Sequence, residues 1–315
     1  MVRYTIQRLV LIAITLVVII SVSFITLRMM PGSFITNRNM PEDVRAVIEA
    51  KYHVNEPMIV QYTYFMKDFL SGDFGVSLAI QPKVPVFDII KQKVPITLQL
   101  NIFSLLLTIP FAALFGITAA LKKNTIIDHI ISVVVIVFIS VPSFVFASLL
   151  QYNLAFKFGW FPILLSTERA LTLSKFHSMV LPILALTFGS VAGLTRYIRA
   201  ELAEALNSDY MLLAKAKGLT QLQATVRHAI RNSFVPLAAM IISLFTSVLG
   251  GSLVIEKIFG IPGMGPVLID SINAKDHTLA MGVLFFYSVI GLLSTLLIDL
   301  SYGIIDPRIR MGGKK

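Results

Sequence analysis

The chain has 315 residues, of which 56% are hydrophobic and 14% charged, and it carries a formal net charge of +10. Because soluble domains contain about 25% charged residues, this composition excludes an ordinary soluble domain and indicates a polytopic membrane protein. The sequence has no cysteine, which excludes disulfides, thiolate catalysis and thiolate metal sites. We interpret much of the positive charge as the Lys and Arg excess of cytoplasmic loops, and we expect no nucleic acid partner.

Six stretches of the sequence are apolar enough to cross a bilayer, which takes about 20 residues of helix. They lie at about residues 9–29, 96–121, 130–152, 179–198, 234–255 and 279–304. The first stretch is too long for the apolar region of a typical signal peptide and lacks a cleavage site of small residues, so we expect it to remain as a span. The sequence therefore predicts an all-α fold with six transmembrane helices.

The positions of Lys and Arg predict the orientation of these spans. Positive charge is denser on the side that holds both termini, the 122–129 turn and the 199–233 loop. Cytoplasmic loops are enriched in basic residues, so we expect both termini to be cytoplasmic. One transmembrane domain, 1–315, then comprises an N-terminal span 1–29, an extracytoplasmic helical loop 30–95, core spans 96–304 with the 199–233 loop, and a cytoplasmic tail 305–315.

The first outer loop carries signals for two helices. Pro41 and the two acids after it mark the start of a helix that runs to about Lys51. A second helix is expected to follow Pro57 and to end at 71–72, before a glycine-containing turn. A later outer segment, 259–266, suits a tight turn into a short apolar helix.

Several kinds of functional site are missing from the sequence. There is no Walker A motif, and the glycine-rich segment 259–266 lacks the Lys-Ser/Thr ending that such a motif requires. No His, Asp and Glu cluster has metal-site spacing, and no Ser, His and acid set indicates a nucleophile. Ion-coupled carriers place ionisable groups at mid-membrane, whereas the expected spans contain almost none. We therefore expect no catalytic residue, metal or cofactor in this chain, and an energy source supplied by a partner.

Polar, proline and glycine residues within the spans are the remaining candidates for function. Gln99 and Asn101 in the second span and Pro142 in the third are candidates for a substrate pathway. Proline kinks a helix, and kinked helices can surround a cavity, although proline also occurs in membrane helices without such a role. Gly189 and Gly193 form a G-x-x-x-G pattern, which allows close helix approach but is common by chance.

The 199–233 loop is polar and basic, yet its sequence is patterned as helices. We expect the fourth span to continue as a helix until it is interrupted at 207–209, where N-cap residues open a short helix from Tyr210 to Lys217. Gly218 fits the left-handed position after that helix. The Thr220-x-x-Gln223 spacing predicts a capping box at the start of the next helix.

A short helix between two elbows can transmit a push from a soluble partner to two spans, whereas the alternative is a merely solvated loop. Capping signals at both ends favour the first interpretation. The residues that we assign to docking of such a partner are Ser208, Asp209, Tyr210, Leu213, Ala214, Lys215, Lys217 and Gly218.

This loop resembles the "EAA" loop of importer-type ABC permeases. Ala214-x-x-x-Gly218 is similar to the core of that motif, and residues 209–219 and 227–236 resemble the B-type subunit of the oligopeptide/dipeptide/nickel family. The resemblance covers nearly the whole chain, down to the 306–310 tail. Leu212 and Leu213 stand where the general motif has Glu and Ala, a departure that is common in this subfamily.

The resemblance implies a type I ABC importer permease in the bacterial cytoplasmic membrane. Such a chain pairs with a homologous C-type permease, and two cytoplasmic ABC ATPases, which bind ATP and Mg, dock on coupling helices, here 208–218. An extracytoplasmic binding protein delivers the substrate. Oligopeptides or dipeptides are the expected cargo, with nickel or glutathione as the alternative. A self-sufficient ion-coupled carrier is the competing interpretation from another class.

Overall fold

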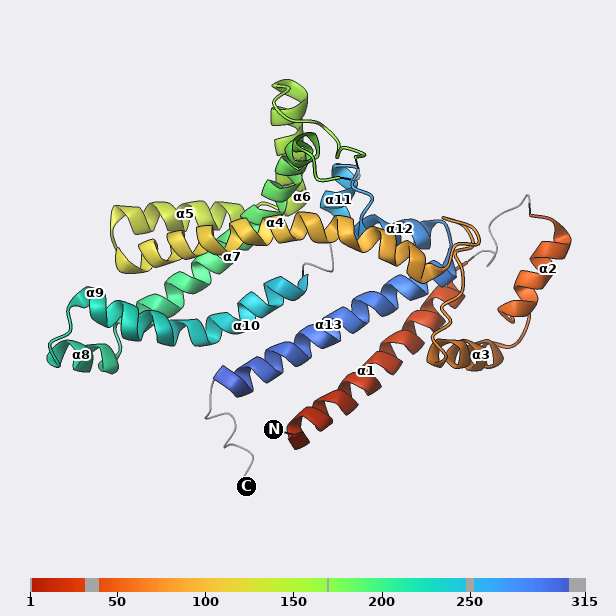
Figure 1. Ribbon diagram of the computed structural model, residues 1–315, viewed down its shortest axis with the longest axis horizontal. Coiled ribbons are helices and arrows are strands. Elements are labelled where there is room, and N and C mark those ends of the chain that lie inside the picture. Colours follow the sequence, from red (N-terminus) through yellow and green to blue (C-terminus); the bar gives the residue numbers. More distant parts are fainter. Residues whose placement is uncertain (1, 32–39, 169, 248–251, 306–315) are drawn as a thin grey trace. The chain divides into compact units, whose positions relative to one another are not determined.

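A computed structural model describes residues 2–31, 40–168, 170–247 and 252–305 (Figure 1). Across these ranges the chain is helical, and its β-structure is a single isolated bridge between Val76 and Pro85. The predicted all-α class is therefore confirmed. The described tail ends at Ile305, so the predicted 306–310 match lies outside the described residues.

The chain forms two compact units. One unit contains residues 2–97 and 262–293, and the other contains residues 98–261 and the chain from 294 onward. The helices of the first unit, two of which continue into the second, are α1 (Val2–Met29), α2 (Glu42–Lys51), α3 (Met58–Leu70), α4 (Val86–Leu121), α12 (Met264–Asn273) and α13 (His277–Ile305). The other helices of the second unit are α5 (Ile126–Ser140), α6 (Ser143–Leu150), η1 (Gln151–Lys157), α7 (Leu173–Leu206), α8 (Asp209–Ala216), α9 (Gln221–Ala224), η2 (Thr225–Ile230), α10 (Arg231–Ser247) and α11 (Leu253–Ile258).

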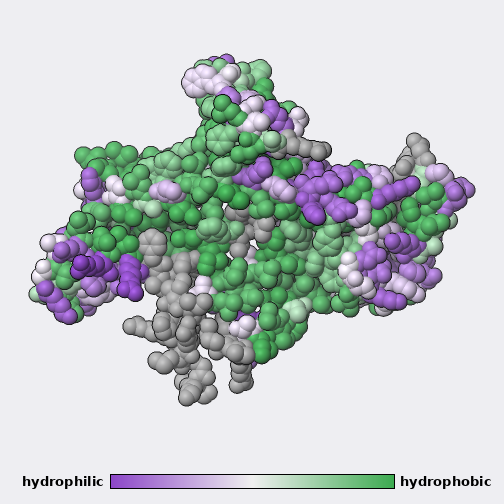
Figure 2. Space-filling view, viewed as in Figure 1, coloured by the Kyte–Doolittle hydropathy of each residue, from purple (hydrophilic) through white to green (hydrophobic). Residues whose placement is uncertain are grey.

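Four helices in the described part of the chain are long and apolar enough to cross a membrane. They are Thr5–Met29, Val86–Leu121, Leu173–Leu206 and His277–Ser301. α4 begins ten residues before the predicted span, because Lys91 and Lys93 make its first turns too polar for a hydropathy pattern to include them. Figure 2 shows apolar residues over α5 and α13 and hydrophilic residues over α2, α3 and the α8–α9 region.

The third predicted span, 130–152, is not one helix. α5 and the α6–η1 segment are bent by 97° relative to each other. Val141 and Pro142 are both extended at the break, with ψ of 122° and 135°, because a residue before proline disfavours the helical conformation. The ring of Phe188 on α7 packs against Phe138 and Phe146 on the two sides of this break, so α7 supports the bend.

The fifth predicted span, 234–255, also differs from the structure. α10 ends at Ser247, and α11 is a separate helix that begins at Leu253. Ser252 is extended, and its hydroxyl accepts a hydrogen bond from the Ile255 amide, so a new helix begins there. Up to five spans meet the length and composition criteria within the described residues, and the number six stays a prediction.

α7 is the helix around which the second unit packs, with α5, α6 and α10 against it. α4 comes close to it at Gly116, where an added Cβ would lie 2.7 Å from Cβ of Ile198. The Ser104 and Thr187 hydroxyls are also 3.0 Å apart between these helices. At Gly189 of the G-x-x-x-G pattern, no atom of the described residues outside its own helix backbone lies within 4 Å of where its Cβ would lie.

The first unit is held together by aromatic rings and by one buried carboxylate. Phe24 of α1 stacks on Phe65 of α3 with ring centroids 4.8 Å apart, and Phe69 of α3 packs edge-on against Phe285 of α13 at 5.2 Å. The two helices predicted in the first outer loop are confirmed as α2 and α3. The aromatic side of α3 therefore packs onto α1 and α13.

The carboxylate of Asp276 anchors the 77–80 segment to the start of α13, and we call this arrangement the Asp276 cluster. Asp276 is fully buried and accepts hydrogen bonds from the Ser77 hydroxyl at 2.5 Å and from the amides of Leu78, Ala79 and Ile80 at 2.9–3.1 Å. Burial raises the pKa of this carboxyl, but these hydrogen bonds outweigh burial and hold the pKa below its usual value.

Candidate functional site

The predicted short helix in the 199–233 loop is present as α8, and we call residues 207–220 the α8 elbow. α7 continues as a helix beyond its apolar part to Leu206, as predicted, and Asn207 follows as its C-cap. Ser208 occupies the N-cap position of α8, and its carbonyl accepts the Met211 amide at 3.0 Å. Its hydroxyl does not cap α8, because it donates to the Ala205 carbonyl at 2.6 Å and so ties the elbow back to α7.

α8 ends in a Schellman motif centred on Gly218. Gly218 has φ of +87°, the left-handed conformation in which glycine is favoured. The Gly218 amide donates to the Lys215 carbonyl at 2.9 Å, and the Leu219 amide donates to the Ala214 carbonyl at 3.3 Å. These two bonds satisfy carbonyls that the end of the helix would leave unpaired, and they reverse the chain direction.

The capping box predicted at Thr220 and Gln223 is also confirmed. The Thr220 hydroxyl accepts the Gln223 amide at 3.3 Å, and the Gln223 side chain accepts the Thr220 amide at 3.1 Å. α9 then passes directly into the π-helix η2 and on into α10. Both ends of α8 are therefore fixed by local hydrogen bonds.

One face of α8 is buried on a core built largely from alanine. Met211 is 1% exposed and Ala214 is 5% exposed. They pack with Ala120 near the end of α4, with Leu202, Ala203 and Ala205 of α7, and with Ala224 and Ala229 of α9 and η2. Small side chains bring these helix ends close together, so α8 packs directly against the ends of α4 and α7.

The opposite face of α8 is exposed and partly apolar. Leu212 and Leu213 are 64% and 56% exposed, and Tyr210 is 37% exposed. Asp209, Lys215, Lys217 and Gly218 are exposed as well. Of the eight predicted docking residues, Ala214 faces the core and Ser208 is half-buried, whereas the other six lie on the accessible side. Met211 was not among the predicted functional residues, because helical spacing from Tyr210 does not show which face of the helix is buried.

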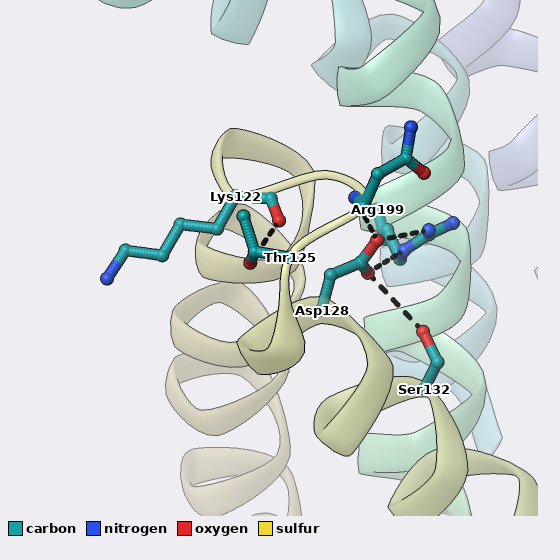
Figure 3. Close-up of polar contacts among 6 residues, drawn as sticks. Lys122, Thr125, Asp128, Ser132 and Arg199 are labelled. Atoms are coloured by element: carbon teal, nitrogen blue, oxygen red, sulfur yellow. Dashed lines mark hydrogen bonds and ion pairs between the residues drawn. The ribbon is translucent and has the colours of Figure 1, made fainter.

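A buried ion pair joins α5 and α7 in the same unit (Figure 3). The Arg199 guanidinium donates from Nε and Nη2 to the two carboxylate oxygens of Asp128, at 2.5 and 2.7 Å. Asp128 is 1% exposed and also accepts from the Asn124 amide at 2.9 Å. Lys122 points away from the pair (Figure 3). The two members are 71 residues apart, so no local sequence pattern predicts this pair.

The predicted pathway residues are not gathered at one place. Gln99 and Asn101 are half-buried on α4, and positions two residues apart do not face each other on a helix. Pro142 is exposed at the break between α5 and α6. Their assignment to a substrate pathway stays a prediction. Among the described residues, no group of three His, Asp or Glu side chains is placed to hold a metal ion.

The sequence of the chain is similar to those of known membrane transport proteins. Residues 112–311 match the model of the "Binding-protein-dependent transport system inner membrane component". The chain is 37% identical over its full length to a dipeptide transport system permease protein, DppB, of Bacillus subtilis, which it also covers completely. It is 33% identical to the oligopeptide transport system permease protein OppB of Escherichia coli K12, over 94% of this chain and 95% of that one.

A solved structure shares the fold. An amino acid ABC transporter crystallised with histidines matches with a TM-score of 0.52 and 20% identity, over 69% of this chain and 94% of that one. At this identity the likeness shows the fold alone. The α8 elbow lies within the residues that match the family model.

Proposed function

Because the chain belongs to the family of binding-protein-dependent transport system inner membrane components, we propose that it forms one half of the pore of an ATP-driven importer of dipeptides or oligopeptides. The names of its relatives support this cargo, since both are peptide transport permeases that align with nearly the entire chain. Alternating access of the pore to the two sides of the membrane would move the peptide. Under this proposal both chain termini and the α8 elbow are cytoplasmic.

The observation that carries the proposal is the α8 elbow. It presents an accessible apolar face, with Leu212 and Leu213, on a helix whose other face is locked onto the ends of α4 and α7. A soluble partner that binds this face can transmit a push to α4 and α7 at the same time. The partners would be two ABC ATPases, which bind ATP and Mg, together with a homologous C-type permease and an extracytoplasmic binding protein.

Replacement of Leu213 by Asp tests this function. Leu213 contributes an exposed side chain, so Leu213→Asp should leave folding intact while placing a charge in the docking interface. The complete transporter would be purified and assayed for co-purifying ATPase, ATP hydrolysis and uptake of a labelled peptide into vesicles. We expect the variant to lose bound ATPase and uptake.

The control is Leu173→Asp, the same change at an exposed leucine at the beginning of α7. It should keep the ATPase and transport at the level of the unmodified chain. Normal uptake by Leu213→Asp, or uptake by the unmodified complex without ATP, would overturn the proposal. The second result would favour an ion-coupled carrier.

A further inference from the structure

A hollow of about 410 Å³ lies between α5 and α7, beside the Asp128–Arg199 ion pair. Apolar side chains from α5, those of Ile131, Val135 and Ile136, form one side of it. Two hydroxyl groups and two arginines form the rest. None of these residues belongs to the α8 elbow or is among the pathway candidates Gln99, Asn101 and Pro142.

The arginines give the hollow a net positive charge. Arg199 is balanced by Asp128, and that pair uses two of the five N–H donors of the guanidinium. Arg196 also lines the hollow, is exposed, and has no ion-pair or hydrogen-bond partner among the described residues. An unbalanced guanidinium at the edge of a concave site favours an anionic ligand, and phosphate above all, because arginine binds phosphate through paired hydrogen bonds.

A buried hydroxyl provides a second, independent sign of a ligand. Thr195 is 1% exposed and lines the hollow, and its Oγ1 has no hydrogen-bond partner. A buried hydroxyl without a partner destabilises a protein, so native structures usually supply one. Ser132, the other hydroxyl in the hollow, is already used, because it donates to Asp128 at 3.4 Å.

The apolar side of the hollow decides which kind of anion fits. Ile136 is 60% exposed, and it is continuous along α5 with the exposed side chains of Val133 and Val137. A soluble phosphate would leave this surface in water. An acyl chain would cover it, while the headgroup phosphate attached to that chain reached Arg196 and Thr195.

We propose that this hollow is a binding site for an anionic phospholipid, with its phosphate held by Arg196 and the Thr195 hydroxyl and one acyl chain along α5. The site goes beyond peptide import. It takes from the proposed function only the orientation that places it in the cytoplasmic leaflet. The ion pair between Asp128 and Arg199 holds α5 and α7 at the spacing that forms the hollow.

Lipid retention tests the site independently of transport. The full transporter would be placed in nanodiscs that contain equal amounts of phosphatidylglycerol and phosphatidylcholine, and retained lipids would be counted by native mass spectrometry. We expect preferential retention of phosphatidylglycerol. Arg196→Gln should reduce the preference about fivefold, which corresponds to one basic contact with an anionic lipid. Added inorganic phosphate should not compete, because it has no acyl chain.

Arg231→Gln is the matched control, since it removes the same charge from an exposed arginine outside the hollow. It should leave the preference unchanged. Thr195→Val should also weaken retention, and it should raise the melting temperature of the lipid-free protein because it removes the unpartnered hydroxyl.

Several outcomes would overturn the proposal. One is equal retention of both lipids by the unmodified chain, and another is an equal effect of Arg196→Gln and Arg231→Gln. Displacement of the lipid by inorganic phosphate would show a soluble-anion site instead. Loss of a co-purifying subunit with unchanged lipid retention in Arg196→Gln would show that the hollow is a protein interface. Loss of peptide uptake alone would concern the proposed function and not this site.

Discussion

The α8 elbow and the Asp276 cluster position segments between long helices, but by different physical means. In the elbow, many weak contacts act together, namely backbone hydrogen bonds at both ends of α8 and an alanine-rich core beneath it. In the Asp276 cluster, one carboxylate collects four hydrogen bonds from a segment about 200 residues earlier in the chain.

This difference determines which changes each region tolerates. The exposed side chains of Leu212 and Leu213 are not part of the core beneath α8, so they can vary to suit a partner. The four hydrogen bonds from the 77–80 segment to Asp276 all end on one carboxylate, so one substitution or one proton weakens all of them together. The arrangement of the α8 elbow suits a docking surface, and that of the Asp276 cluster suits a fixed structural contact.

The largest expected effect is that of Asp276→Asn. An amide keeps the shape of the carboxylate but loses its charge and directs hydrogen-bond donors toward amides that are also donors. We expect a loss of about 3 kcal/mol in the free energy of unfolding, the range for hydrogen bonds to a buried charge. Denaturant titration of the detergent-solubilised protein measures this. Asp88→Asn, at an exposed position in the first turn of α4, should lose less than about 1 kcal/mol.

Met211→Ala should have the next largest effect. It leaves a cavity in the core beneath α8, and truncation of a buried methionine costs about 2 kcal/mol or more. Leu212→Ala, one residue further on the exposed face, should change stability by less than about 0.5 kcal/mol. The same denaturation assay compares them. Equal losses would mean that α8 does not pack as described.

Two glycine substitutions should have opposite signs. Gly218→Ala should destabilise the protein by about 1 kcal/mol, because alanine is strained at a φ of +87° although no atom would contact its Cβ. Gly189→Ala, in the interior of α7 where there is also open space, should be neutral or stabilising by about 0.5 kcal/mol. Thermal unfolding measures both, and unchanged stability of Gly218→Ala would contradict the left-handed turn.

The smallest effect is a dependence of stability on pH. The folded-state pKa of Asp276 lies below its unfolded value of about 3.9, so its contribution is fully present above that pH. The contribution is lost as the pH falls through the folded-state pKa, where the folded protein takes up the proton. Between pH 5 and 3, the unfolding free energy should therefore fall more steeply for the unmodified chain than for Asp276→Asn.

Local features of the fold could be predicted from the sequence. The left-handed turn at Gly218 and the capping box of Thr220 and Gln223 depend on hydrogen bonds within a few residues, and both are confirmed. The hydroxyl of Ser208 shows the limit of such rules, because it donates to the Ala205 carbonyl of the preceding helix and does not cap α8. The sequence places Pro142 inside one predicted span, 130–152, as a kink or as an ordinary membrane-helix proline, and the 97° break there is accompanied by packing against Phe188 from another helix.

Long-range features could not be predicted. Asp128 with Arg199 and Ser77 with Asp276 are pairs separated by 71 and 199 residues, and no periodicity connects them. Gly116 is the site of close helix approach, although Gly189 and Gly193 have the familiar spacing. Which face of α8 is buried, and therefore the role of Met211, follows only from the helices that pack against it.

The π-helix η2 between the elbow and α10 has a consequence for how such proteins can diverge. A π segment accommodates an extra residue without breaking the helix, and each inserted or deleted residue rotates the following helix by about 100°. The insertion or deletion of a single residue in η2 would therefore rotate α10 about its axis and change which of its faces contacts its neighbours. The capped turns before η2 would keep their geometry.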